Sequence, residues 1–351
     1  MAGGFSISRV DALNVFDTQL VAAGNFASAG GAFASSIAQW NLSFWSALQA
    51  PVPQVLAMEQ LGSRFIAAGS FLQSTTNQTP AHNIIDWNGS TLARVQNPLC
   101  CGEGTNGTIR ALKSFTGLST SHLVVGGDFT VAGGVTANRI AQFNQQLING
   151  GWVTLGAGFN NSVNAIERFN NVIYAGGTFT SSGQSLISKI AQFNGTIWVA
   201  VGTGVNGTVN AMKVFNGFLY VGGDFATAGG ISTGCLARWN GTTWSTFSGI
   251  PGNILVGSVT ALEVHNNKLY VANTFGSSTH VLELNGTSLP LVGTANGVIS
   301  ALKSDGNHLY VLGGFSTIGG VNANRIARWN ATAGWSDVEG GTNDVVNTLG
   351  V

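Results

Sequence analysis

Residues 208–247 read TVNAMKVFNGFLYVGGDFATAGGISTGCLARWNGTTWSTF, and this stretch decides the fold. It predicts four short strands, of the form VNAMKVF, LYVGGDF, CLARW and TWSTF, which are rich in β-formers and separated by Gly and Asn. The third and fourth strands are joined by Asn240-Gly241, a pair that favours a two-residue type I′ turn because both residues tolerate positive φ. The stretch therefore predicts one four-stranded antiparallel sheet.

Related units recur along the whole chain of 351 residues. An alanine that anchors the first strand occurs seven times, at intervals of 45, 54, 54, 46, 50 and 40 residues, and a Phe that closes the second strand also occurs seven times. Four-stranded repeats of this length are typical of propeller blades. The sequence therefore predicts an all-β chain that forms one seven-bladed β-propeller, with four antiparallel strands per blade. The anchors are Ala12, Ala57, Ala111, Ala165, Ala211, Ala261 and Ala301, followed by Phe26, Phe71, Phe129, Phe179, Phe225, Phe275 and Phe315.

The predicted propeller spans residues 1–351 as a single domain. Paired glycines in the second strands, such as Gly126-Gly127, are expected where neighbouring blades crowd near the axis. Two units depart from the pattern. Unit two has a longer loop at Gln73–His82, and unit six lacks the Ala-Gly-Gly segment and has Leu284 where Trp or Phe is expected. The repeats occupy about 9–53, 54–106, 107–161, 162–207, 208–257, 258–297 and 298–344.

The pattern LYVGGDF…AGG…NRIARWNGTTW resembles the kelch-like propeller repeats of secreted bacterial surface proteins. It is also similar to the propeller of the fungal polarity protein Rax2. The resemblance covers nearly the whole chain and implies the propeller fold. It also implies a binding or structural module, because such propellers mostly have those roles.

The chain has no net charge, with 14 Lys and Arg against 14 Asp and Glu, and charged residues make up only 8%. Nucleic-acid binding needs a basic surface, so this balance argues against it. No apolar run approaches the ~18 residues of a membrane helix. The N-terminus lacks a signal-peptide pattern, which leaves a cytoplasmic chain or a mature or trimmed form of an exported one. The abundance of Gly, Ser, Thr and Asn favours an extracellular or cell-surface protein.

The first strands carry alternating charges two residues beyond the anchor alanines. Six positions alternate between Glu and Lys, and the seventh is neutral Asn14, where a ring of odd number must break the alternation. Positions i and i+2 share a face of a strand, so each Glu is expected beside a Lys of the next blade. Such pairs would fix the blade register; the alternative is a polar channel that binds an ion or small ligand. The charged positions are Glu59, Lys113, Glu167, Lys213, Glu263 and Lys303.

The C-terminal residues resemble one more first strand, although unit one already has its own at 9–16. Three explanations stay open: the parent chain is longer, the C-terminal strand closes the ring while the N-terminal segment shifts, or one terminal strand pairs with a neighbouring subunit. An unpaired edge readily templates such pairing, and a head-to-tail contact that does not close builds a filament or tube. The surplus segment is Val345, Val346, Asn347, Thr348, Leu349, Gly350 and Val351.

Apparent catalytic motifs have structural interpretations. Residues 202–207 match GxGxxG and residues 230–234 match GxSxG, but both fall in predicted loops that no helix follows. The histidines lack metal-ligand spacing, and His265 and His308 are expected to be exposed near a turn. We therefore expect no enzyme activity, no cofactor and no metal. The three cysteines form neither a disulfide framework nor a zinc motif; they are Cys100, Cys101 and Cys235.

The leading hypothesis is a non-catalytic extracellular structural or adhesive propeller, which assembles with itself through a terminal strand into a filament or tube. Its partners are then copies of itself or other cell-surface proteins. The alternative is a lectin-like propeller, in which tryptophans at the blade edges stack on sugars. Packing between blades is the competing interpretation of these residues, since most of them fall in third or fourth strands. They are Trp40, Trp45, Trp87, Trp152, Trp198, Trp239, Trp244, Trp329 and Trp335.

Overall fold

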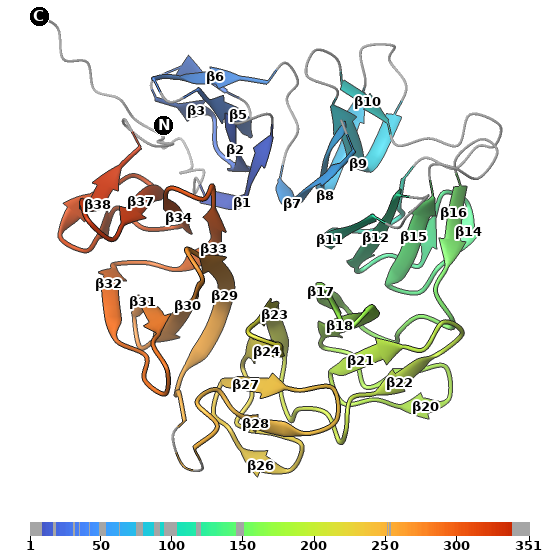
Figure 1. The fold of residues 1–351 in the computed structure, drawn as a ribbon. Coiled ribbons are helices and arrows are strands. Elements are labelled where there is room, and N and C mark those ends of the chain that lie inside the picture. Colours follow the sequence, from blue (N-terminus) through green and yellow to red (C-terminus); the bar gives the residue numbers. More distant parts are fainter. Residues whose placement is uncertain are drawn as a thin grey trace, which may run out of the picture.

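The seven repeats fold as seven blades of four antiparallel strands around a central axis (Figure 1), and the outermost strand of blade 6 also pairs with the small hairpin of blade 7. The structure is a computed structural model. It describes residues 9–338 except 17–18, 31, 35, 42, 49–53, 63, 75–79, 88–91, 95–103, 117–120, 145–150, 251 and 253. The predicted all-β, seven-bladed propeller is confirmed. Within the described residues, no helix is long and apolar enough to cross a membrane.

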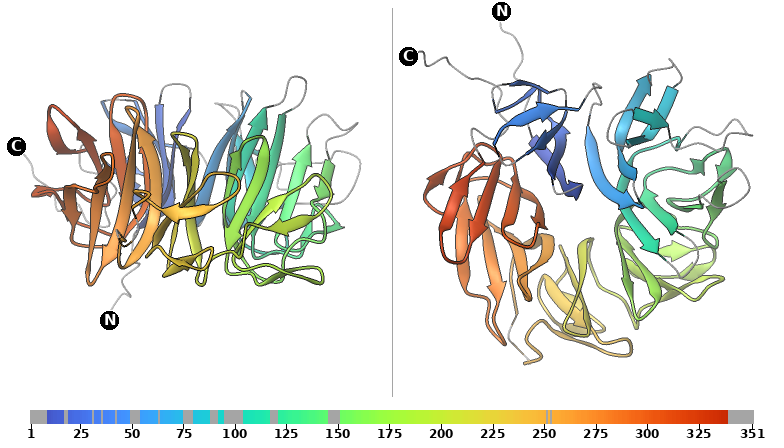
Figure 2. Two further views of the ribbon diagram at one scale, coloured as in Figure 1. Left: turned by 60° about the horizontal axis from the view of Figure 1, so that its bottom comes forward. Right: turned by 45° about the horizontal axis from the view of Figure 1, so that its top comes forward.

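Each blade runs from its innermost strand at the axis to its outermost strand at the rim, and neighbouring strands pair antiparallel. Figure 2 shows the ring from two further directions, as a disc whose inner strands run roughly along the axis. Every blade lies inside one of the predicted repeats. In order from blade 1 to blade 7, the strands are β1 (Arg9–Phe16), β2 (Gln19–Asn25), β5 (Ile37–Trp40) and β6 (Trp45–Ala47); β7 (Val55–Leu61), β8 (Arg64–Ser74), β9 (Pro80–Trp87) and β10 (Leu92–Arg94); β11 (Ile109–Thr116), β12 (Ser121–Gly127), β15 (Ile140–Asn144) and β16 (Gly151–Thr154); β17 (Val163–Phe169), β18 (Val172–Gly177), β21 (Ile190–Phe193) and β22 (Trp198–Ala200); β23 (Val209–Phe215), β24 (Phe218–Gly223), β27 (Leu236–Trp239) and β28 (Trp244–Thr246); β29 (Ser258–His265), β30 (Lys268–Phe275), β31 (Ser278–Leu284) and β32 (Leu291–Ala295); β33 (Ile299–Ser304), β34 (Leu309–Gly313), β37 (Ile326–Asn330) and β38 (Gly334–Asp337).

Five blades insert a small hairpin between their second and third strands, formed by the Ala-Gly-Gly segment or its equivalent. In the described parts of blades 2 and 6, the two divergent units, the second and third strands instead continue to pair with each other. In blade 6 this pairing ends at Phe275 and Ser278, so Phe275 is exposed, whereas the equivalent Phe of the other blades is buried. The small hairpins are β3 (Ser28–Ala29) with β4 (Ala32–Phe33), β13 (Val131–Ala132) with β14 (Val135–Thr136), β19 (Ser181–Ser182) with β20 (Ser185–Leu186), β25 (Thr227–Ala228) with β26 (Ile231–Ser232), and β35 (Thr317–Ile318) with β36 (Val321–Asn322).

The outer hairpin turns differ from the predicted type I′ geometry. In the turn after β27, only Gly241 has a positive φ, of 102°, and it is the first of two loop residues between Asn240 and Thr243. This is the pattern of a type II′ turn, which requires glycine at that first position. Asn240 has a different role: its Oδ1 accepts hydrogen bonds from the backbone N–H groups of Thr242 and Thr243. The side chain, and not a left-handed backbone, explains why asparagine fits there.

Every first strand contains a β-bulge one residue before its anchor alanine. In blade 5 the pairing with β24 shifts between Val209 and Ala211, and the other six blades shift at the equivalent step. A bulge leaves one residue unpaired and re-aims its side chain. The sequence pattern did not predict this feature, and six of the seven bulge residues line a cavity at one mouth of the central channel.

The core consists of seven separate hydrophobic clusters, one at each contact between neighbouring blades. The paired glycines make these contacts close. A Cβ atom on Gly126 would lie 2.6 Å from Val163 Cγ1 of the next blade, and one on Gly176 would lie 2.5 Å from Val209 Cγ1. Burial is therefore distributed around the ring, because each sheet covers the face of its neighbour.

The ring closes by packing between complete blades. Strand β1 supplies the innermost position of blade 1, and it packs beside β33 of blade 7. At the rim of the same contact, the Trp45 indole N–H donates to the carbonyl oxygen of Val338 at 3.2 Å. The seven innermost positions are thus filled by β1, β7, β11, β17, β23, β29 and β33, and the segment 345–351 lies outside the described residues.

Candidate functional site

The charged ring of the first strands forms two ion pairs between blades. Lys113 Nζ lies 2.9 Å from a carboxylate oxygen of Glu167, and Lys213 Nζ lies 2.8 Å from one of Glu263. In both pairs the lysine reaches to the glutamate of the following blade. Burial alone would lower the pKa of Lys113, but the carboxylate of Glu167 raises it above the usual lysine value. Ion pairs between blades are therefore present, but the predicted pairing was wrong: Glu167 and Glu263 each pair with the lysine of the preceding blade and not with that of the next one.

Asn14 separates the two remaining charges. Its amide is buried and donates to the carbonyl oxygen of Met58 at 3.1 Å. Glu59 accepts two hydrogen bonds from Ser114 of the next blade, from the backbone N–H and the hydroxyl. Lys303 makes no ion pair within the described part of the chain, and burial lowers its pKa despite the attraction of Glu263 and Glu59. The residue that follows it around the ring is the neutral Asn14.

A cavity of about 270 Å³ occupies one mouth of the central channel. It is lined by the anchor alanines and by bulge residues, among which Asp11 and Arg110 are charged. Among the described residues, no group of three or more His, Cys, Asp and Glu is placed to hold a metal ion. The channel mouth thus offers a few scattered polar groups above a mostly aliphatic wall.

The fourth-strand tryptophans connect neighbouring blades. The Trp198 indole N–H donates to the carbonyl of Leu155, and Trp244 donates in the same way to Val201, at 2.8 Å and 2.9 Å. Each of these rings also packs on an aromatic residue of the third strand in its own blade, as Trp244 does on Trp239. Most of the tryptophans are buried. The described tryptophans therefore follow the packing interpretation, which leaves little indole surface for stacking on a sugar.

The remaining candidate residues occupy structural positions. His265 is only 2% exposed and its Nδ1 lies 2.8 Å from Ser304 Oγ, so the expectation that it would be exposed was wrong. Its ring contacts Ser304 of the next blade, whereas the turn residues Asn266 and Asn267 are exposed. Cys235 is buried next to the Leu255 carbonyl and the Asn273 amide, and burial raises the pKa of its thiol to about 11. Cys100 and Cys101 lie outside the described residues.

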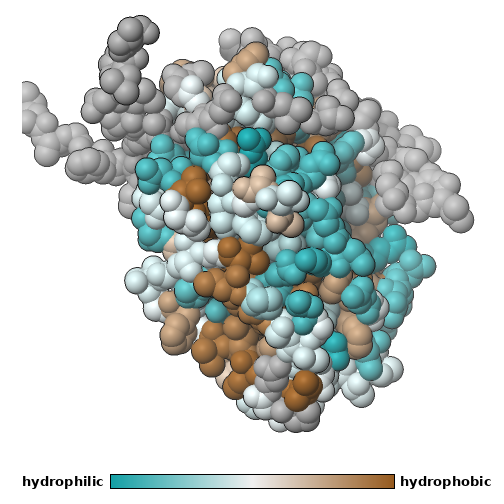
Figure 3. Space-filling model, turned by 60° about the vertical axis from the view of Figure 1, so that its left-hand side comes forward, coloured by the Kyte–Doolittle hydropathy of each residue, from teal (hydrophilic) through white to brown (hydrophobic). Residues whose placement is uncertain are grey.

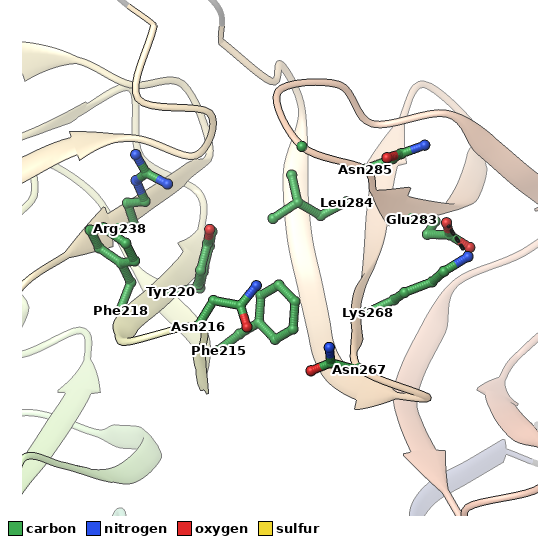
Figure 4. A pocket seen from close by; sticks show the side chains of 11 residues that line it. Phe215, Asn216, Phe218, Tyr220, Arg238, Asn267, Lys268, Glu283, Leu284 and Asn285 are labelled. Atoms are coloured by element: carbon green, nitrogen blue, oxygen red, sulfur yellow. Dashed lines mark ion pairs between the residues drawn. The ribbon is translucent and has the colours of Figure 1, made fainter.

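A cleft of about 320 Å³ opens between blades 5 and 6 (Figure 4). One wall comes from blade 5 and contains Phe215, Phe218 and Tyr220. The opposite wall comes from the turns of blade 6, and Leu284 lies on it. Asparagines stand around the opening, at positions 216, 267 and 285. Aromatic surface with convergent polar groups is typical of small-ligand sites.

The charges at this cleft do not balance. Lys268 Nζ lies 2.8 Å from Glu283 Oε1, and Glu283 also accepts the hydroxyl of Tyr270, so its charge is satisfied. Arg238 stacks its guanidinium 4.2 Å from the centre of the Phe218 ring and donates through Nε to the Ser245 hydroxyl. Within the described residues it has no carboxylate partner. The cleft therefore carries one uncompensated positive charge.

The family of the chain follows from a comparison with known families. A family model described as the Rax2 C-terminal beta propeller domain matches residues 83–298, which is more than half of the chain. The chain belongs to the Rax2 propeller family. The similarity to kelch-like repeats of bacterial surface proteins stays a prediction. A search of curated proteins gives no match.

Solved structures share the fold of this Rax2 propeller at low sequence identity. The computationally designed Ika8 protein matches with a TM-score of 0.51 and 14% identity, over 92% of this chain and 96% of that chain. Sqt1 of Saccharomyces cerevisiae matches with a TM-score of 0.51 and 12% identity, over 98% of this chain and 91% of that chain. At this identity, the likeness shows a common architecture alone.

Sequence reasoning on this Rax2 propeller missed the cleft between blades 5 and 6. The signal was present, because Leu284 departs from the Trp or Phe found at the same position of the other units. The pattern showed a divergent repeat, but the lining comes from two blades, and only the packed ring brings Tyr220 and Arg238 opposite Leu284.

Proposed function

We propose that the chain is a non-catalytic extracellular structural or adhesive module. The observation that carries this proposal is that the repeated charged and aromatic side chains are engaged in contacts between blades. Lys113 pairs with Glu167, Lys213 pairs with Glu263, and the fourth-strand indoles bind carbonyl groups of the preceding blade. Groups committed in this way hold the ring together and are not free to act as nucleophile or general base. The composition, which is poor in charged residues and rich in Gly and Asn, supports a location outside the cell.

Several large apolar side chains are exposed on the surface and can make contacts with other proteins. The small hairpins expose Phe33, Leu186 and Ile231, and the hairpin strands β20 and β26 lie at the rim (Figure 1). Figure 3 shows the wall of the ring on the side of blades 6 and 7, where apolar residues gather in patches among polar ones. Exposed apolar surface of this kind is typical of interaction sites. It supports adhesion through protein–protein contact.

Self-association through residues 345–351 is the form of assembly that we propose. The support is that the ring already contains seven first strands, so an eighth first-strand sequence has no vacant innermost position. Pairing with the edge of another copy would satisfy its backbone N–H and C=O groups.

Electron microscopy of the purified chain tests this assembly. We expect filaments or tubes from the full chain, and single rings after deletion of residues 345–351 or with Val346→Pro, which removes a strand N–H. Single rings from the full chain at every concentration, or filaments that survive the deletion, would refute self-assembly. Turnover of a glycoside or ester substrate panel would refute the non-catalytic role.

The second candidate function is binding of carbohydrate, and the cleft between blades 5 and 6 favours it. Its aromatic wall and surrounding amides have the chemistry of a sugar site, although the tryptophans are engaged elsewhere. The two functions are compatible, since an adhesive module can hold a glycan.

A further inference from the structure

The cleft between blades 5 and 6 exists because one aromatic residue of the repeat is missing. At the preceding contact, Trp239 of blade 5 packs into one cluster with Phe169 and Tyr174 of blade 4. The equivalent residues between blades 5 and 6 are Phe215, Tyr220 and Leu284, which also share one cluster. Leucine is much smaller than tryptophan, so this contact is less completely filled, and Leu284 lines the cleft of about 320 Å³.

The same replacement leaves a hydroxyl group without an indole beside it. Trp239 lies next to the hydroxyl of Tyr174, and Trp329 lies next to that of Tyr270. Tyr220 has Leu284 in place of an indole beside it, and within the described residues its hydroxyl makes one long contact, of 3.5 Å, with the carbonyl oxygen of Phe247. The buried Tyr220 therefore brings a polar group with spare hydrogen-bonding capacity to the wall of the cleft.

The polar groups around the opening are also available. Within the described part of the chain, the side-chain amides of Asn216, Asn267 and Asn285 make no hydrogen bond, and each can both donate and accept. The charged groups that face the cleft are Arg238, Lys268 and Glu283, and the last two neutralise each other at 2.8 Å. Arg238 is the unpaired cation, held against the Phe218 ring.

We propose that this cleft binds one acidic sugar residue of a glycan. A pyranose has an apolar face for the aromatic wall, and its hydroxyls both donate and accept, which matches the amides and the Tyr220 hydroxyl. A carboxylate on the ring pairs with Arg238, whose planar fork fits that group. The volume is at the lower end of the roughly 300–1,000 Å³ of small-molecule sites, so it holds one ring and not an extended chain. The proposal rests on the role of the chain as a binding module.

Filling the cleft tests the proposal without removing a binding group. Leu284→Trp restores the residue type of the other repeats, so the protein is expected to fold with an equal or higher melting temperature. Phe193→Trp, at the same repeat position in blade 4, is the matched control. The probes are glucuronate and galacturonate, compared with glucose and galactose, by saturation-transfer NMR and isothermal titration.

We expect the native protein and Phe193→Trp to bind a uronate, and Leu284→Trp to lose binding at least 10-fold. Arg238→Gln should remove the preference for uronate over the neutral sugar. No uronate binding to the native protein, or equal binding by Leu284→Trp, would overturn the proposal. Binding of N-acetylglutamate but not of the sugars would also overturn it, in favour of a peptide carboxylate. If Leu284→Trp still assembles or adheres, the adhesive function stands whatever the sugar result.

Discussion

Lys113 and Lys303 occupy the same position of the repeat, yet their pKa values shift in opposite directions. The difference comes from the next blade. Lys113 reaches Glu167, whereas the residue that follows Lys303 is the neutral Asn14. A seven-membered ring of alternating charges must contain such a break. In this ring the break leaves one lysine, Lys303, without an ion pair among the described residues. A charge that is partly withdrawn from water without a partner destabilises the folded state.

Removal of the unpaired lysine should therefore stabilise the protein. Because burial lowers the pKa of Lys303, the unfolded chain binds its proton more tightly, and the folded state loses stability as pH falls from about 10.5 through the folded pKa. We expect Lys303→Met to raise the melting temperature at pH 7. Lys213→Met leaves Glu263 without its cation. It should lower the melting temperature and reduce the free energy of unfolding by about 1–3 kcal/mol. Equal effects of the two variants would contradict this account.

Reversing the charge of a residue in an ion pair should lower the free energy of unfolding more than reversing a solvent-exposed charge. Glu167→Lys places a second ammonium beside Lys113 in a buried position, so we expect a loss of about 2–4 kcal/mol in the free energy of unfolding. Asp337→Lys, on an exposed outermost strand, is the control and should change stability by less than about 0.5 kcal/mol. Urea denaturation measures both. Similar midpoints for the two variants would show that the ring pairs do not hold the blades together.

The Cys235 thiol should be unreactive in the folded protein. The thiolate is the reactive form, and burial raises the pKa of this thiol to about 11 from a usual value of 9.0. In a Cys100→Ser, Cys101→Ser background, we expect no reaction with Ellman's reagent at pH 8 until the chain is unfolded. The raised pKa also means that this group's contribution to stability is complete below pH 9 and is lost as pH rises toward 11, a dependence that Cys235→Ala removes. Rapid labelling of the native protein would contradict the buried position.

At the scale of the element, four of the five small hairpins are held by one asparagine of the preceding loop. Asn206 Oδ1 accepts the backbone N–H groups of Ala226 and Thr227, at 2.8 Å and 2.9 Å, and so fixes the start of β25. The residues Asn106, Asn160 and Asn296 do the same in blades 3, 4 and 7. Blade 6 lacks the small hairpin. An element of only two short strands thus depends on a side chain from outside it.

Loss of that side chain should open the hairpin locally. Asn206→Ala leaves two N–H groups without their acceptor, so we expect a loss of about 1–2 kcal/mol and faster amide hydrogen exchange in β25 and β26. Asn307→Ala, which changes an exposed amide that makes no side-chain hydrogen bond in the described structure, is the control. If exchange in the hairpin is unchanged by Asn206→Ala, the asparagine does not hold it.

At the scale of the whole molecule, the contact between blades 7 and 1 closes the ring without a shared sheet. Blade 1 takes all four strands from residues 9–47, and blade 7 takes its strands from residues 299–337. The contacts that close the ring are one hydrophobic cluster and the hydrogen bond from the Trp45 indole to the Val338 carbonyl oxygen. The other blade contacts are also supported by the continuous chain, so this contact is the expected place of opening.

A pair of equivalent substitutions distinguishes closure from ordinary packing. Trp45→Phe and Trp198→Phe remove the same indole N–H from the same repeat position, and each should cost about 1 kcal/mol. Only Trp45→Phe acts at the contact where the chain does not connect the blades. We therefore expect it to raise hydrogen exchange and protease sensitivity in both blades 1 and 7, while the effect of Trp198→Phe stays local. The same local response from both variants would contradict a weak closing contact.

The sequence by itself determined the number of blades, the order of strands and the place of the charged ring. Each of these follows from periodicity within one repeat, which sets strand faces and turns through contacts between residues close in the chain. Burial of the tryptophans between blades was also foreseen as one of two interpretations. The type I′ turn at Asn240 and the exposure of His265 were wrong, because a side-chain hydrogen bond and a neighbouring blade decided them.

Only the tertiary structure decided what lies between blades. The isolation of Lys303 and the cleft beside Leu284 both involve residues from two repeats, 40 or more positions apart in the chain. The repeat pattern shows that Leu284 is smaller than the residues at the same position of the other repeats. Which groups line the cleft beside it depends on the facing blade, which contributes Tyr220 and Arg238. The physical reason is that each blade buries its faces only against its neighbours, so a change in one repeat takes effect in the space it shares with the next.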